Sequence, residues 1–402
     1  MRNLSQKLEK FGHLTGIVFG FALGQGAALV LHLYLTGLGH AAFVGELCVG
    51  MGVITIVQST SDLGGLFLMS DRNLQGLDRR VASANLVRLV FAVILVLVVP
   101  FATRWLDSPL ASGIVDTGKY VALIWALNLT GVLDGLGKSY VAGPFACGPW
   151  LFSTVAAFFV APSDTYSAGV SIGVAYVVGA AVTVIIHYVI AKRMYLCSPA
   201  WDEIRTFAVN GFLYTSLSFV SLIYGRVLLF LVYSKLDGVI TGYFALTRSL
   251  LSGLQQLITF VRRIEFPDLK AKKPIGTVAG LWLQRVSLQL SVLPLILFVM
   301  ATWFLDLPNE LWALMFAFLG LLPIWCIYSA MGQIFIAENR TGINLFIATI
   351  GSLASIAIAY ACFVRFGVFA TVLGEALKFT LMTVLYVGAM RIRSRSAVNV
   401  AC

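Results

Sequence analysis

The sequence predicts an all-α polytopic membrane protein with twelve transmembrane helices. Hydrophobic residues make up 59% of the chain and charged residues 11%, whereas soluble domains carry about a quarter charged residues. The apolar residues gather in stretches long enough to cross a bilayer, which takes about 20 residues per helix. Between these stretches, loops rich in Lys and Arg alternate strictly with loops that contain few of them. These observations exclude a water-soluble globule, and the unbroken apolar runs exclude alternating barrel strands.

Twelve apolar stretches are predicted to span the membrane. In chain order they cover residues 14–35, 41–68, 82–104, 112–133, 141–161, 169–191, 207–233, 239–261, 277–304, 311–336, 342–364 and 367–390. The first span contains glycines at nearly four-residue spacing, which favours close packing against other helices. Prolines within the third, ninth and tenth spans favour kinks because proline lacks a backbone N–H; they are Pro100, Pro294 and Pro323.

Loop charge predicts that both termini lie in the cytoplasm. Alternate loops hold nineteen basic residues, and the loops between them hold three: Arg104, Lys235 and Arg365. Cytoplasmic loops are enriched in Lys and Arg, so the nineteen mark the cytoplasmic side. They are Arg2, Lys7, Lys10, Arg72, Arg79, Arg80, Lys138, Lys192, Arg193, Arg205, Arg262, Arg263, Lys270, Lys272, Lys273, Arg340, Arg391, Arg393 and Arg395.

A charged cytoplasmic connection at residues 192–205 separates six predicted helices from six others. We therefore expect an N-terminal lobe at residues 1–200 and a C-terminal lobe at residues 201–402. Because six is even, both lobes enter the membrane in the same orientation, as parallel repeats about a pseudo-twofold axis along the membrane normal.

The sequence argues against several other classes of function. The net charge of +10 is explained by cytoplasmic Lys and Arg residues that lie next to anionic lipid headgroups. We therefore expect the lipid bilayer, and no nucleic acid, as a partner. The histidines and cysteines lack metal-ligand spacing, and no cofactor is expected. The short loops leave no room for a soluble catalytic domain, so we expect no enzyme. An intramembrane glycan polymerase or ligase stays open as an alternative, although no large outer loop is present.

Two stretches of the sequence resemble a transporter family. Residues 37–45 (GLGHAAFVG), followed by Ser61-Asp62-Leu63-Gly64, resemble the first hairpin of polysaccharide transporters of the multidrug, oligosaccharidyl-lipid and polysaccharide exporter superfamily. Residues 242–245 (GYFA) and 265–269 (EFPDL) are similar to that family's eighth helix and the loop after it. The twelve-helix length and the topology match as well.

This resemblance implies a flippase in the bacterial inner membrane. Such a protein moves polyprenyl-pyrophosphate-linked oligosaccharide across the bilayer by alternating access, for surface polysaccharide or lipopolysaccharide synthesis. The lipid-linked oligosaccharide is then the substrate, and a polysaccharide polymerase and chain-length machinery are expected partners. A drug/cation antiporter of the same superfamily is the alternative; it needs an acidic counter-charge in its cleft.

Basic residues inside the predicted spans favour an anionic substrate. A central charge in the bilayer costs several kcal/mol, so such residues usually face a cavity or a partner. The basic residues within the predicted spans are Arg88, Lys119, Arg226, Arg248, Arg285 and Lys378. Lys119 has Asp116 nearby for an intrahelical pair, and Lys378 has Glu375.

We expect the substrate to be bound by Arg226, Arg248, Arg285, Lys378 and Arg88. Arg226, Arg248 and Arg285 have no acidic residue three or four positions away, whereas Arg88 is near enough to the cytoplasmic end of its span to snorkel. Arg226, Arg248, Arg285 and Lys378 against Glu375 give the C-terminal lobe a charge of +3. Arginine holds phosphate oxygens bidentately, so a pyrophosphate headgroup fits this sign.

Acidic residues within the spans are few. Glu46 in the second span is level with His32 in the first. The two form either a hydrogen-bonded structural pair or a protonatable site that couples transport to an ion gradient. Asp62, near the inner end of the second span, is expected to shape the end of that helix.

Overall fold

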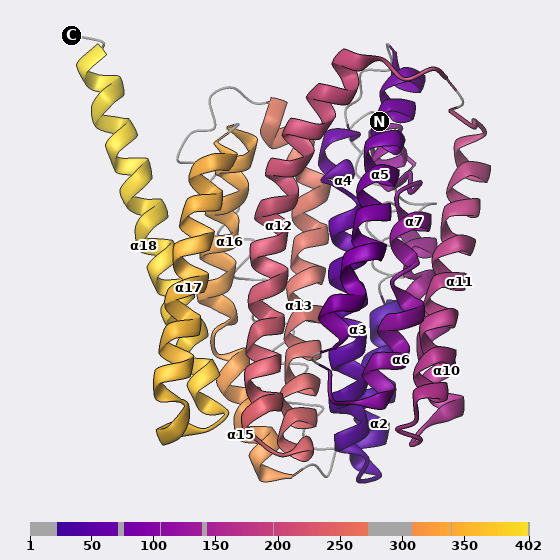
Figure 1. The fold of residues 1–402 in the computed structure, drawn as a ribbon. Coiled ribbons are helices and arrows are strands. Elements are labelled where there is room, and N and C mark those ends of the chain that lie inside the picture. The colour runs from indigo at the N-terminus through magenta and orange to yellow at the C-terminus, as the bar shows by residue number, and fades with distance from the viewer. Residues whose placement is uncertain are drawn as a thin grey trace, which may run out of the picture. The chain divides into compact units, whose positions relative to one another are not determined.

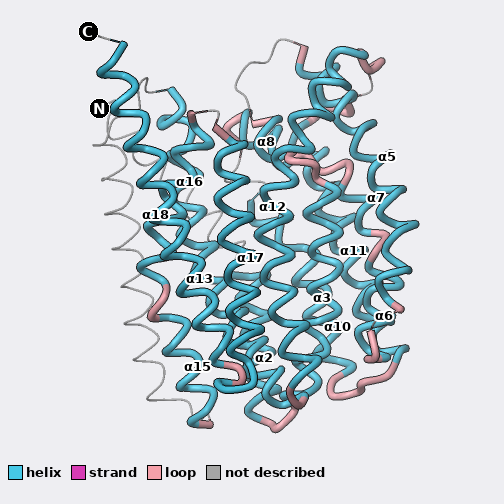
Figure 2. Tube along the Cα trace, turned by 60° about the vertical axis from the view of Figure 1, so that its left-hand side comes forward, coloured by secondary structure: helices cyan, strands magenta, loops and turns pink. Residues whose placement is uncertain are grey.

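The computed structural model describes residues 22–70, 76–104, 106–138, 143–195, 197–271, 308–338 and 340–400. Helices connected by short loops form nearly all of these ranges, and no strand occurs within them (Figures 1 and 2). Seven of the described helical segments are long and apolar enough to cross a membrane. The chain is therefore an all-α polytopic membrane protein, as the sequence predicts.

The helices follow the predicted spans closely. Their bounds are η1 (Ala22–Gly26), α2 (Ala27–Gly37), α3 (Ala41–Ser61), α4 (Gly65–Leu68), α5 (Leu77–Thr103), α6 (Pro109–Gly118), α7 (Val121–Trp125), α8 (Thr130–Gly135), η2 (Gly143–Cys147), α10 (Gly148–Val160), α11 (Tyr166–Ala191), α12 (Trp201–Lys235), α13 (Gly238–Ala271), α15 (Asn309–Leu319), α16 (Leu322–Ala337), α17 (Thr341–Phe366) and α18 (Phe369–Val400). Every predicted span except the ninth overlaps a helix. The ninth, at residues 277–304, lies outside the described residues.

Among the predicted spans that the structure describes, three are interrupted. The second span breaks between α3 and α4, where Leu63 and Gly64 adopt positive φ angles of 44° and 66°. The fourth, expected to be one helix, is divided into α6, α7 and α8. The tenth is divided into α15 and α16, and Pro323 lies at the first turn of α16. Pro100, by contrast, lies within a continuous α5, so a proline alone did not locate the breaks.

The chain divides into two compact units. Unit 1 comprises Met1–Arg226 and Asp237–Leu246, and unit 2 comprises Val227–Leu236 and Thr247–Cys402. Helices α12 and α13 each contribute residues to both units. The predicted lobe division at residue 200 stays a prediction.

Helix α3 is the central helix of unit 1. Within its apolar stretch 72% is buried, against 28% for α5, because α3 packs against α2, α5, α6 and α7. Helices α6 and α11 approach most closely at glycines. A Cβ added at Gly169 would lie 2.1 Å from the carbonyl oxygen of Leu110, so only a residue without a side chain fits there.

Unit 2 is built around the long antiparallel pair α17 and α18, which lie side by side in Figure 1. Helices α15 and α16 also pack against α18. Aromatic rings fill this interface: Tyr328 of α16 stacks on Phe379 of α18, with ring centroids 5.1 Å apart. This packing places one face of α18, including Glu375 and Lys378, inside unit 2.

Candidate functional site

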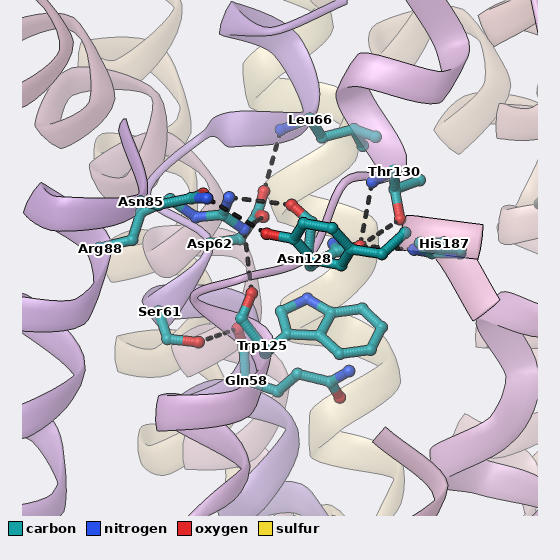
Figure 3. Close-up of polar contacts among 11 residues, drawn as sticks. Gln58, Ser61, Asp62, Leu66, Asn85, Arg88, Trp125, Asn128, Thr130 and His187 are labelled. Carbon is teal, nitrogen blue, oxygen red and sulfur yellow. Dashed lines mark hydrogen bonds and ion pairs between the residues drawn. The ribbon is translucent and has the colours of Figure 1, made fainter. Parts of the chain in front are cut away.

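A buried ion pair joins α5 to the end of α3 in unit 1 (Figure 3). The Nη2 atom of Arg88 lies 2.6 Å from Oδ1 of Asp62, and the Arg88 side chain is completely buried. The expectation that Arg88 snorkels to the membrane surface is therefore wrong. A guanidinium without access to water needs protein acceptors, and the surrounding helices supply them.

Those acceptors are backbone carbonyls in the interrupted fourth span. Arg88 Nη2 donates to the carbonyl oxygen of Trp125 at 3.0 Å, and Nη1 donates to that of Asn128 at 3.0 Å. Trp125 ends α7 and α8 begins at Thr130, so these carbonyls lie at the gap between the two helices. The Asn128 carbonyl is a group that an unbroken helix would have paired internally, whereas the Trp125 carbonyl also accepts from the backbone N of Asn128 at 2.9 Å.

The Asn128 side chain completes the same gap. Its Oδ1 accepts from the backbone N of Thr130 at 3.0 Å and from the Thr130 hydroxyl at 2.7 Å. The Nδ1 atom of His187, on α11, lies 3.1 Å from the same oxygen. Because the Thr130 N–H fixes this atom as the amide oxygen, His187 carries its hydrogen on Nδ1. Residues from α5 and α11 thus hold the break in place.

Asp62 holds the other break. Its Oδ2 accepts from the backbone N of Leu66 at 3.0 Å and so caps the short helix α4, which confirms the expectation that Asp62 shapes this helix end. Helices α4 and α8 also touch directly, since a Cβ added at Gly131 would lie 2.4 Å from the carbonyl oxygen of Gly65. The binding of substrate by Arg88 stays a prediction. The Arg88 guanidinium already contacts Asp62 and the carbonyls of Trp125 and Asn128.

Glu46 and His32 contact different residues. Glu46 Oε2 accepts from the hydroxyl of Ser108 at 2.6 Å, and the ring nitrogens of His32 lie 3.9 and 4.0 Å from the Cys48 sulfur. Ser108 also accepts from the backbone N of Ala111 and thereby caps α6. The structural alternative of a Glu46–His32 hydrogen bond is therefore wrong, and the ion-coupling role of both residues stays a prediction.

Arg226, on α12, lies against the backbone of α3. A Cβ added at Gly52 would be 2.8 Å from Arg226 Nη1 and 3.0 Å from its Cζ. Tyr176 of α11 lies within electrostatic range of Arg226. The Tyr176 hydroxyl donates a hydrogen bond to Oε1 of Gln58. Gly52 therefore opens the space that the guanidinium occupies in unit 1.

Three charged residues gather in unit 2. Arg248 of α13 donates from Nη1 to Oε1 of Glu375 in an ion pair, and its guanidinium lies 5.8 Å from the ring centre of Phe318. Lys378 lies one turn along α18 from Glu375 and interacts with it electrostatically. From the sequence, Glu375 was expected to neighbour Lys378, and no carboxylate was found near Arg248. In the structure Glu375, 127 residues further along the chain, is the carboxylate that pairs with Arg248.

Exposure distinguishes the members of this trio. The Arg248 side chain is 24% exposed, whereas Glu375 and Lys378 are 1% and 5% exposed. With all three groups ionised, the trio carries a net charge of +1, since it has two cations and one anion. Arg248 is thus the most exposed member of the trio, and a planar guanidinium is a group that suits a phosphate or carboxylate.

The other expected basic residues contribute less. Arg285 lies outside the described residues. Lys119 does not pair with Asp116: its ammonium lies 5.5 Å from the ring centre of Tyr120, and Asp116 accepts from the hydroxyl of Tyr166 at 3.2 Å. Within the described part of the chain, no group of three or more His, Cys, Asp or Glu residues is placed to hold a metal ion.

No protein-family model matches this chain, and no curated protein sequence matches it.

Solved structures nevertheless resemble the whole chain. An outward-facing structure of a multidrug resistance MATE family transporter of the MOP superfamily matches with a TM-score of 0.64 at 14% sequence identity, covering 96% of both chains. An inward-facing structure of such a transporter matches with a TM-score of 0.61 at 14% identity, covering 96% of this chain and 95% of that one. A MOP superfamily transporter from Pyrococcus furiosus, whose reversed binding-pocket polarity suggests a different function, matches with a TM-score of 0.50 at 14% identity over 96% of both chains. The chain therefore has the fold of MATE transporters of the MOP superfamily.

Proposed function

We propose that this protein is a flippase that moves polyprenyl-pyrophosphate-linked oligosaccharide across the bacterial inner membrane by alternating access. Its fold resembles outward-facing and inward-facing structures of one transporter family, which supports a cycle between two such states. The polytopic helical architecture supports transport of a substrate across the bilayer. The sugar-pyrophosphate headgroup passes through the protein while the polyprenyl tail stays in lipid.

The partly exposed Arg248 carries the assignment of an anionic substrate. It is backed by a buried Lys378, and together the two cations outnumber the one carboxylate beside them. A diphosphate diester supplies two negative charges and acceptors for a bidentate guanidinium. Arg226 adds a second partly buried cation, in unit 1.

A drug/cation antiporter is the second candidate. The likeness of the fold to multidrug resistance transporters favours it, as do the carboxylates of Glu46 and Glu375 within apolar helices. Each of these carboxylates, however, has a partner: Ser108 for Glu46 and Arg248 for Glu375. An organic cation would have to displace Arg248, a fixed cation, from the site.

The side of the membrane on which lipid-linked oligosaccharide accumulates tests the proposal. In a host strain that lacks the protein, we expect the intermediate to accumulate on the cytoplasmic face, where externally added glycosidases cannot reach it. Restoring the protein should expose the glycan to the enzyme. An intermediate that reaches the outer face normally and stays unpolymerised would identify a polymerase or ligase instead. Normal export combined with new sensitivity to cationic drugs would identify the antiporter.

A further inference from the structure

Glu375 lies between two cations in the interior of unit 2. It accepts from Arg248 of α13, and Lys378 lies one helical turn away on α18. Only 1% of Glu375 is exposed, so water compensates little of its charge. Arg248 has more exposure, at 24% of its side chain. A ligand that approaches the trio therefore meets the partner of Glu375 before it meets Glu375.

The other charged groups on the described helices that pack against α18 lie at helix ends, and the buried Cys326 of α16 carries a neutral thiol. In α15 and α17, Glu310, Tyr360 and Arg365 are exposed. Arg340, at the start of α17, pairs with Glu338 at the end of α16, and Tyr328 of α16 stacks on Phe379. Within the described helices, the charges that act on Glu375 are thus those of Arg248 and Lys378.

Binding of an anion changes this charge balance. The free trio carries +1, so a diphosphate diester of charge −2 brings the site to −1. If the phosphate takes the guanidinium, Glu375 keeps only Lys378 as a neighbouring cation at a site of charge −1, and uncompensated negative charge in the protein interior is strongly disfavoured. Protonation of the carboxylate restores neutrality at the site.

We propose that Glu375 is an internal counter-ion that a diphosphate headgroup displaces from Arg248, and that the displaced carboxylate takes up one proton. This inference rests on the proposed function and assigns the proton linkage to a residue in unit 2. The proton comes from bulk water, forms an O–H bond on a Glu375 oxygen, and leaves when the anion departs and Arg248 returns. Anion binding and proton binding are then linked, and each strengthens the other.

Calorimetry on the full-length protein in phosphatidylcholine nanodiscs tests the linkage. The probe is UDP-glucose, a soluble diphosphate diester whose phosphate oxygens stay ionised throughout the neutral range. Titration in two buffers of different ionisation enthalpy gives the number of protons taken up with each ligand. We expect about one proton per UDP-glucose for the wild type, and an affinity that falls as the pH rises. A wild-type affinity independent of pH, or binding without proton uptake, would overturn the inference and leave the anion site intact.

Two variants assign the proton to a residue. Glu375→Gln removes the competing charge, so UDP-glucose should bind about tenfold more tightly and without proton uptake. Glu310→Gln makes the same chemical change at an exposed position of α15 and should behave as the wild type. Proton uptake by Glu375→Gln at the wild-type level would overturn the assignment. If this variant does not fold, the pH dependence of the wild type still decides the linkage.

Two further outcomes concern the ligand. Failure of the wild type to bind UDP-glucose would remove the anion site of the proposed function, and this inference with it. A second set of nanodiscs contains phosphatidylglycerol, because a bulk lipid headgroup offers a phosphate too. We expect binding to persist in these discs. Loss of binding there would identify the membrane lipid as the ligand and overturn the assignment to a diphosphate headgroup.

Discussion

The guanidinium of Arg88 and the carboxylate of Asp62, 2.6 Å apart, join the places where two membrane helices are interrupted. Asp62 caps α4 after the break in the second span, and Arg88 donates to carbonyls between α7 and α8. Backbone groups without helical partners are costly in a bilayer unless buried side chains satisfy them. The ion pair therefore stabilises both breaks at once, and the short helices α4 and α8 depend on the same contact.

Replacement of Arg88 should destabilise the protein strongly. Arg88→Gln leaves the Asp62 carboxylate, which is only 15% exposed, without its cation, and removing one partner of a buried pair typically costs about 3–5 kcal/mol. Thermal unfolding of detergent-solubilised protein, followed by size-exclusion chromatography, measures the loss. The matched control is Arg193→Gln: Arg193 pairs with Asp78 at 3.4 Å, but its side chain is 62% exposed, so less than about 1 kcal/mol should be lost. Equal stability of the two variants would show that Arg88 does not support the breaks.

Membrane topology should follow the loop charges. A reporter that is active only outside the cytoplasm should be silent when fused after Arg80, Arg205, Lys273 or Arg395, and active after His40, Ser163 or Asn309. The reason is the split of nineteen basic residues against three between the two sets of loops. Activity of the fusion at Lys273 would contradict the arrangement of six helices plus six.

The sequence predicts the helices well because a membrane span needs a long apolar run, and that requirement is local. It does not predict the interruption of the fourth span, because residues 126–129 contain a single polar residue, Asn128, and their support comes from Arg88 and His187 on other helices. A single acid and a single base near the inner ends of consecutive antiparallel spans were nevertheless a usable signal for the Asp62–Arg88 pair.

The pairing of Arg248 with Glu375 had no such signal. The two residues lie in the eighth and twelfth spans, and only the packing of unit 2 brings them together. Searching for partners three or four residues away finds Lys378 for Glu375 but leaves Arg248 alone. Sequence reasoning therefore identified the charged residues of the site and not their partners.

Glu46 offers a test of proton coupling in unit 1. Glu46→Gln keeps an amide oxygen that can accept from Ser108, so the cap of α6 and the abundance of the protein should be preserved. If Glu46 couples transport to protons, export of lipid-linked oligosaccharide should lose its dependence on the proton gradient, measured in inverted membrane vesicles with and without a protonophore. Unchanged gradient dependence at normal abundance would assign Glu46 a structural role.

Crowding at Gly52 should displace Arg226 without removing its charge. In Gly52→Ala the new Cβ lies 2.8 Å from Nη1, so the guanidinium must move. If Arg226 binds the headgroup, UDP-glucose affinity should fall about tenfold, equivalent to roughly 1.4 kcal/mol. Gly50→Ala is the control, since its Cβ crowds the apolar Ile114 at 2.9 Å on the same helix. A similar loss of affinity in both variants would indicate a general distortion of α3.

Direct replacement of the two arginines tests the anion site itself. Arg226→Ala and Arg248→Ala should abolish surface glycan at normal protein levels, because loss of one partner from a buried charged contact typically costs about 2–5 kcal/mol. Lysine at either position should restore export only in part, since an ammonium lacks the bidentate fork that holds two phosphate oxygens. Glu375 keeps Lys378 as a neighbouring cation when Arg248 is removed, so this variant should remain folded. Surface glycan and membrane abundance are measured in the same cells. Full export by either alanine variant at native abundance would show that these arginines only hold neighbouring helices together.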